Sequence, residues 1–160
     1  MPSSGSTVRN PGVGPNAEPL AASTAAARCP PPHSPVVALG TRIGGTAVGT
    51  AVMTGGGKLR AKHVIHAVGP KMGEGDEDKK LSSAVRACLA LADRHGLKSI
   101  AMPAISTGAF GFPIDRAARI ILTEIQRYLQ GGTKLLRVVV VLYGEDAWKI
   151  FAREMRRGFR

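Results

Sequence analysis

The pattern of apolar and polar positions becomes regular after about residue 40. Short apolar runs typical of strands occupy residues 48–54 and 63–68, and the turn-forming segment GGGKLRA separates them. Another short buried strand is predicted at residues 99–102. The run LLRVVVVL at residues 135–142 predicts a strand that is apolar on both faces, as a central strand covered by helices would be.

Three segments between and after these strands have helical periodicity. Apolar residues recur at intervals of three and four over residues 81–92, and Gly96 is a stop signal for that helix. A second stripe covers residues 114–129, in a helix predicted to start at Pro113, a favoured first-turn residue, and a third covers residues 148–155. Strands alternating with helices predict an α/β fold with layered packing.

The first 40 residues differ from the rest in composition. Eight of the eleven prolines lie there, and no Phe, Trp or Tyr occurs before Phe110. Because such a segment has little to bury, residues 1–40 are predicted to be a disordered Pro/Ala/Ser-rich tail, and residues 41–160 the folded part. Glu18 is the only acid of the tail, and LAASTAAAR faintly resembles a transit peptide. A tail without a targeting signal is favoured, which leaves the cytoplasm as the expected compartment.

Charge and cysteine content narrow the classes of partner. The formal net charge of +11 suits an anionic ligand and also a nucleic-acid surface. Cys29 and Cys88 are too far apart for a CxxC motif, and Cys88 falls on an apolar helical stripe, which indicates a core residue. We therefore expect no metal and no cofactor. No apolar run approaches the roughly 20 residues that span a bilayer, so no membrane association is expected.

The segment PAISTGAFGF connects the strand predicted at residues 99–102 with the helix predicted after Pro113. This places a flexible loop at the carboxyl end of a strand and at the amino end of a helix. Ligands of open α/β sheets bind at such positions. A helix amino terminus also offers unpaired N–H groups and a partial positive charge, both of which attract phosphate.

The residue types in this loop fit a phosphate ligand. Gly108 and Gly111 are able to adopt positive φ and allow consecutive amides to turn toward a diphosphate. Ser106 and Thr107 add hydroxyl donors, and Phe110 has a ring that suits a sugar or the diphosphate. The alternative is a glycine-containing connector that only turns a corner, because short glycine motifs carry many false positives.

The end of the last predicted strand supplies a second candidate. Tyr143 follows this strand directly and precedes a helix that opens with Glu145 and Asp146. In a parallel sheet Tyr143 emerges on the same rim as the PAISTGAFGF loop, where its ring is able to stack on a base. The alternative is a tyrosine that packs against its own helix. The two acids complement the helix dipole.

Three segments resemble the later two-thirds of a macro domain: VGTAVMTGGGKLRAKHVIHAVGP, LKSIAMPAISTGAFGFP and VVVVLYGEDAW, within about residues 45–155. The resemblance implies a three-layer α/β/α fold with a mixed sheet and binding of ADP-ribose or an ADP-ribosylated ligand. Some family members hydrolyse ADP-ribosyl or O-acetyl-ADP-ribose bonds. Carried over by position, it assigns the ligand contacts to Ile105, Ser106, Thr107, Gly108, Ala109, Phe110, Gly111 and Tyr143.

The chain departs from the family pattern in its first third. Macro domains begin with a strand, a NAAN-like segment and a first glycine-rich loop, and hydrolytic members take their catalytic Asn and Asp from that region. Here the only asparagines are Asn10 and Asn16, in the Pro-rich tail. The resemblance therefore predicts an N-terminally truncated macro domain with no assigned catalytic residue, reduced affinity for ADP-ribose and marginal stability. Binding of ADP-ribose is the favoured function; a deacetylase or ADP-ribosyl hydrolase, and a basic nucleic-acid-binding protein, are the alternatives.

Overall fold

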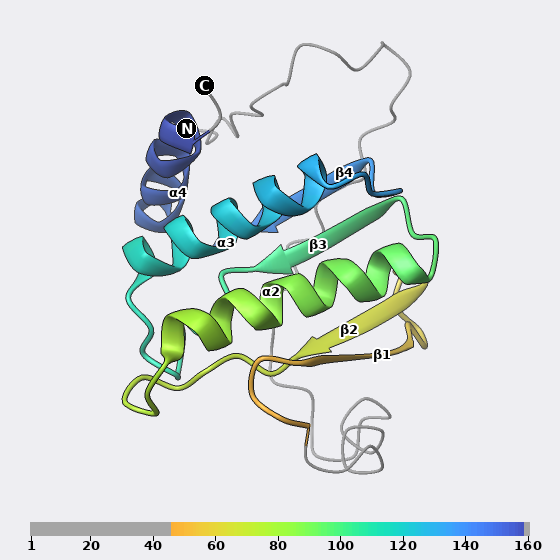
Figure 1. Cartoon of the computed structure of the whole chain (residues 1–160), viewed down its shortest axis with the longest axis horizontal. Helices are drawn as coiled ribbons and strands as arrows, with labels where there is room; N and C mark the ends of the chain where they lie inside the picture. The colour runs from red at the N-terminus through yellow and green to blue at the C-terminus, as the bar shows by residue number, and fades with distance from the viewer. Residues whose placement is uncertain (1–45, 159–160) are drawn as a thin grey trace, which may run out of the picture.

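The computed structural model describes residues 46–158 (Figure 1). The predicted tail at residues 1–40, the predicted domain start at residue 41 and both asparagines lie outside the described residues. The elements, in chain order, are β1 (Ala51–Gly55), β2 (His63–Ala67), α2 (Glu77–Arg94), β3 (Ser99–Pro103), α3 (Ile114–Gln130), β4 (Arg137–Val141) and α4 (Glu145–Gly158). Every predicted strand and helix is present, and the α/β class is confirmed.

The strands pair in both senses. β1 runs antiparallel to β2, from Ala51 opposite Ala67 to Gly55 opposite His63. β3 runs parallel to β4, from Ser99 opposite Arg137 to Pro103 opposite Val141. The predicted mixed strand pairing is thereby confirmed, although the described strands form two separate pairs.

Two strands begin later than predicted because turns precede them. β1 starts at Ala51, since Gly49 has φ +88° and the Thr50 amide donates to the Ala47 carbonyl at 3.2 Å. β4 starts at Arg137, whose amide shares the Lys98 carbonyl with the amide of Leu136. Neither difference alters the order of the elements.

Gly96 and Pro113, the residues predicted to mark helix boundaries, lie at the helix ends. Gly96 has φ +67° and follows α2, and its amide donates to the Asp93 carbonyl at 2.9 Å. α3 starts one residue later than predicted, because Pro113 is the N-cap, with φ −59° and a non-helical ψ of 127°, and Ile114 is the first helical residue. These geometries fix where the chain leaves α2 and enters α3.

The helices lie side by side: α2 packs against α3, and α3 packs against α4. Their buried side chains meet one face of the strands, where Ile65, Met102 and Val140 contact the core. Cys88 lies in this core as predicted, and burial raises the pKa of its thiol to about 11. β4 differs from expectation, because Val141 is 57% exposed and only one of its faces is covered within residues 46–158.

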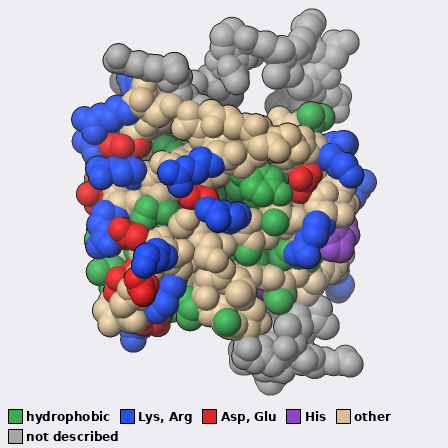
Figure 2. Space-filling model, in the orientation of Figure 1, with side chains coloured by type: hydrophobic (Ala, Val, Ile, Leu, Met, Phe, Trp, Pro, Cys, Tyr) green, Lys and Arg blue, Asp and Glu red, His purple; other side chains and the backbone are tan. Residues whose placement is uncertain are grey.

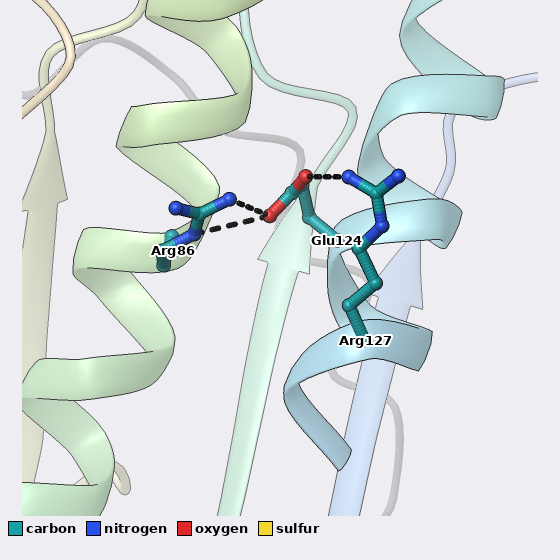
Figure 3. Close-up of polar contacts among 3 residues, drawn as sticks. All are labelled: Arg86, Glu124 and Arg127. Atoms are coloured by element: carbon teal, nitrogen blue, oxygen red, sulfur yellow. Dashed lines mark hydrogen bonds and ion pairs between the residues drawn. The ribbon is translucent and has the colours of Figure 1, made fainter. Parts of the chain in front are cut away.

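A buried carboxylate joins α2 to α3 (Figure 3). Glu124 is 5% exposed, and its Oε2 accepts hydrogen bonds from Arg86 Nε at 3.2 Å and Nη2 at 2.8 Å. Its Oε1 accepts from Arg127 Nη1 at 3.2 Å. Burial alone raises the pKa of Glu124, but hydrogen bonds from Arg86 and Ser82, together with the charges of Arg86 and Arg127, outweigh it and leave this pKa below its ordinary value. Glu124 is therefore an ionised residue that links the two helices.

The helical face is basic without a single basic patch. Figure 2 shows Lys and Arg side chains spread over this face with acidic side chains among them. Within residues 46–158 no helix is long and apolar enough to cross a membrane, and no group of three or more metal-ligating side chains is found.

Candidate functional site

The loop between β3 and α3 has a tight, locally bonded conformation. Both the amide and the hydroxyl of Thr107 donate to the Ala104 carbonyl, at 3.3 and 2.8 Å. The Phe112 amide donates to the Ser106 carbonyl at 3.1 Å. Of the two glycines that are able to adopt positive φ, Gly111 does so (φ +68°) and Gly108 does not. Ser106 takes the left-handed conformation instead, with φ +67°.

Three consecutive amides in this loop remain available. Within the described residues, the amides of Gly108, Ala109 and Phe110 donate no backbone hydrogen bond, whereas Gly111 donates to the Gly108 carbonyl at 2.9 Å. Gly111, Phe112 and Pro113 separate them from α3, whose first-turn amides also have no hydrogen-bond partner within the helix. Free amides beside a helix amino terminus form a favourable environment for an anion.

Ser106 is half-buried in the loop, and its hydroxyl oxygen is fully buried. Its hydroxyl oxygen has no hydrogen-bond partner within the described part of the chain. It lies against Gly69, where a Cβ would collide with this oxygen and approach Ile105 Cγ2 to 2.6 Å. Gly69 is thus a supporting residue that the sequence analysis missed. The only sequence feature that marks Gly69 is the Gly-Pro pair that it forms after a strand, and such pairs also occur in ordinary turns.

A second loop borders the first. The Met72 amide donates to the Phe110 carbonyl at 3.0 Å, which joins the β2–α2 connection to the candidate loop. Glu77 orders this connection, because its Oε1 accepts from the amides of Gly73 and Gly75 at 2.9 and 3.1 Å. Hydrogen bonds from its own amide and from those of Gly75 and Gly73 lower the pKa of Glu77. Residues 71–76 of this connection are exposed, and α2 begins at Glu77.

Tyr143 emerges on the rim that the sequence predicted. Because β3 and β4 are parallel and adjacent, the candidate loop and Tyr143 follow the carboxyl ends of neighbouring strands. The side chain of Tyr143 is 98% exposed, so the alternative of packing against its own helix is wrong. Phe110 is also partly exposed, at 46%. The rim therefore offers two aromatic side chains near the free amides. Phe110 belongs to the loop itself, and Tyr143 follows the neighbouring strand.

One cation lies in the first turn of α3. Arg116 forms an ion pair with Asp78 at 2.6 Å, and its guanidinium carbon lies 5.2 Å from the centre of the Phe112 ring. A surface hollow of about 320 Å³ lies elsewhere, between α2 and α3 around Arg86, Glu124 and Arg127. The loop and Tyr143 are an open rim rather than part of that hollow.

The sequence model of the macro domain matches residues 33–121 of this chain. The chain belongs to the macro domain family. A macro domain-containing protein of Caldanaerobacter subterraneus is 47% identical over 112 residues, which cover 69% of this chain and 63% of that protein. O-acetyl-ADP-ribose deacetylase 1 of Pantoea vagans is 41% identical over 114 residues, with 70% of this chain and 67% of that protein covered.

Solved macrodomains have the same fold. The Oceanobacillus iheyensis macrodomain with ADP is matched with a TM-score of 0.67 and 33% identity, over 69% of this chain and 59% of that one. The Trypanosoma brucei macrodomain in complex with ADP-ribose gives 0.63 and 34%, over 68% and 46%. This macro domain spans about three-fifths of the length of the first curated relatives, at 60–63%.

Proposed function

We propose that this macro domain binds ADP-ribose, or an ADP-ribosylated ligand, at the β3–α3 loop and Tyr143. The observation that supports this most directly is the set of free amides at Gly108, Ala109 and Phe110 before the amino terminus of α3. A diphosphate supplies negative oxygens that accept hydrogen bonds from such amides. Relatives solved with ADP and ADP-ribose are consistent with the same ligand class.

Each candidate residue has a role in this proposal. The diphosphate takes the amides of residues 108–110, and Ser106, Thr107 and Gly111 shape the loop around it. Ile105 and Ala109 line the ligand's place on this rim, and the ring of Phe110 covers the ribose next to the diphosphate. The exposed ring of Tyr143 stacks on adenine, a contact of about 1–3 kcal/mol.

Isothermal titration of the full chain with ADP-ribose tests the proposal. Gly108→Val is the informative variant, because a Cβ at Gly108 meets nothing within 4 Å in the protein itself. The added side chain therefore obstructs the ligand rather than the fold. We expect affinity to fall by more than about tenfold, or 1.4 kcal/mol.

Gly55→Val is the matched control, since Gly55 also has no neighbour within 4 Å of a built Cβ and lies at the end of β1. It should bind like the unaltered chain. AMP, which has the base and one phosphate, should bind more weakly than ADP-ribose. An absence of heat at millimolar ADP-ribose would contradict the proposal.

Hydrolysis is the second candidate, favoured by the deacetylase name of two relatives, which are 41% and 38% identical. The acid nearest the loop in sequence is Asp115, which lies in the first turn of α3 and suits the helix dipole. A deacetylase needs a positioned base or water beside the scissile bond. Turnover of O-acetyl-ADP-ribose that Asp115→Asn abolishes, with ADP-ribose binding unchanged, would support this function.

A further inference from the structure

The β2–α2 connection contains three residues with positive φ just before the helix. Gly73 and Gly75 have φ +91° and +80°, and Asp76, the N-cap of α2, has φ +53°. The left-handed conformation is unfavourable for Asp76, which has a Cβ, and its side chain makes no capping hydrogen bond. The connection is also exposed, so water competes for its backbone groups. It therefore depends on a side chain from elsewhere to fix its conformation.

Glu77, in the first turn of α2, supplies that side chain. A single oxygen of its carboxylate, Oε1, accepts from the amides of Gly73 and Gly75 at 2.9 and 3.1 Å. Hydrogen bonds from its own amide and from those two amides lower the pKa of Glu77, so the carboxylate is ionised at neutral pH. Hydrogen bonds to an ionised acceptor are stronger than those to a neutral one. These two bonds close the backbone around Glu74, the residue between the two glycines.

Met72 joins the fixed connection to the candidate loop. Its amide, one residue before that of Gly73, donates to the Phe110 carbonyl at 3.0 Å. Figure 1 shows the connections before α2 and α3 next to each other at the amino ends of the two helices. Phe110 also carries one of the free amides and the half-exposed ring. A carbonyl held by Met72 limits rotation of the Phe110 backbone, and so the directions of its amide and its ring.

Separate contacts hold the two helices together. Arg116 in the first turn of α3 pairs with Asp78 in the first turn of α2 at 2.6 Å. Further along, Arg86 of α2 pairs with Glu124 of α3 at 2.8 Å. Neither ion pair includes Glu77. A change at Glu77 therefore leaves these contacts in place and acts on the connection and the loop.

We propose that Glu77 is a positioning residue for the β3–α3 loop. Its carboxylate fixes the connection so that the Met72 amide holds the Phe110 carbonyl and keeps the loop ready for its ligand. The inference rests on the proposed function, the binding of ADP-ribose at this loop. Glu77 acts through Met72 and Phe110 without touching the ligand. A loop that is ordered before the ligand arrives binds more tightly, because less freedom is lost on binding.

Calorimetric titration of the full chain with ADP-ribose tests the proposal in a series of variants. Glu77→Ala removes the acceptor, and affinity should fall by about three- to tenfold, the size of a net hydrogen-bond contribution. Glu77→Gln should recover part of this loss, because its amide oxygen accepts from an N–H without a charge. Glu74→Ala is the matched control. It removes the same charge from the same connection, and the Glu74 side chain makes no hydrogen bond or ion pair with the described residues.

Two further measurements separate positioning from a general structural role. In Glu77→Ala without ligand, the Met72 amide should exchange about tenfold faster, while the α3 amides keep their protection. Met72→Pro removes the donor to Phe110 directly and should weaken binding by a similar factor. Combined with Glu77→Ala, it should weaken binding little further, because both changes break the same path. If Met72→Pro loses the α3 protection, the Met72 exchange rate in Glu77→Ala decides, and an unchanged rate overturns the inference.

The outcomes distinguish this inference from the proposed function. If the unaltered chain binds ADP-ribose and Glu77→Ala binds it equally well, the inference alone is overturned. It is also overturned if Glu74→Ala loses as much affinity as Glu77→Ala, since charge would then be the cause, or if the losses in the double variant add. No binding by the unaltered chain overturns the proposed function and the inference together, whatever the exchange rate of Met72.

Discussion

Ser106 combines two unfavourable features in one residue of the candidate loop. Its left-handed backbone, with φ +67°, costs about 1–2 kcal/mol for a residue with a Cβ. Its hydroxyl is buried without a hydrogen-bond partner within the described residues, which adds a desolvation cost. Features of this kind collect at binding sites, where a ligand rather than the fold benefits from them.

Ser106→Gly should therefore raise the free energy of unfolding by about 1 kcal/mol, because glycine removes both costs but adds backbone entropy to the unfolded chain. Affinity for ADP-ribose should fall in the same variant. Urea unfolding and calorimetric titration measure the two effects. Ser99→Gly, at an exposed strand position without positive φ, should instead lower stability slightly. A destabilised Ser106→Gly would show that the hydroxyl supports the fold.

Tyr143→Ala should weaken ADP-ribose binding by about 1–3 kcal/mol without a change in thermal unfolding. The reason is that this side chain is 98% exposed and contributes little to the core. Leu136→Ala is the matched control, since Leu136 is 80% exposed and precedes the opposite end of β4. Equal affinities of both variants would exclude base stacking at Tyr143.

Residue patterns predicted the position of the loop but not its detailed geometry. The sequence identified Gly108 and Gly111 as residues able to adopt positive φ, but it did not predict that Ser106, whose loop is closed by hydrogen bonds to the Ala104 carbonyl and from the Phe112 amide, has this conformation. The supporting role of Gly69 was not predictable for a related reason, because its contact with Ser106 joins segments far apart in the sequence. Local propensity carries no information about such approaches.

At the level of elements, Glu124 of α3 connects to α2 through Arg86, and Arg127 of its own helix also pairs with it. Glu124→Gln should lower the free energy of unfolding by about 1–3 kcal/mol at pH 7, the range for hydrogen bonds to charged groups. Glu145→Gln should change it by less than about 0.5 kcal/mol, because the Glu145–Lys149 pair is solvent-exposed. Urea unfolding of both variants measures this difference.

The same comparison has a defined pH dependence. The pKa of Glu124 is lower in the folded chain than its ordinary value of 4.5, so its contribution is complete well above that value. It is lost as the pH falls below about 4.5 and through the lower folded pKa. The difference between the unaltered chain and Glu124→Gln should therefore shrink from pH 7 to pH 3. A difference that grows on acidification would show that Glu124 is protonated in the fold.

Element types were predictable from periodicity, because helices at three- and four-residue spacing and short β-branched runs were distinct in this chain. Strand pairing was not. Nothing in HVIHAV or SIAM indicates that β2 and β3 each leave one edge unpaired among the described residues. Pairing depends on which strands are available, and that is a property of the whole chain.

For the whole molecule, the net charge of +11 keeps a nucleic-acid partner open as an alternative ligand. The basic side chains of the helical face are interspersed with acids, and several are paired with them, as in Arg116–Asp78 and Arg157–Glu154. A dispersed charge of this kind attracts polyanions through counterion release, without a defined site. The free amides beside α3 instead favour a small anion at one place.

Salt dependence separates these two partners in the same protein. RNA binding that depends on dispersed charge should weaken by about 10³-fold or more between 50 and 200 mM salt if six or more phosphates are contacted. ADP-ribose has two phosphates, so its affinity should change far less over the same range. Fluorescence anisotropy with labelled RNA, with and without excess ADP-ribose, measures both effects. RNA binding that ADP-ribose displaces, and that Gly108→Val weakens in parallel, would place nucleic acid at the β3–α3 loop and contradict dispersed attraction.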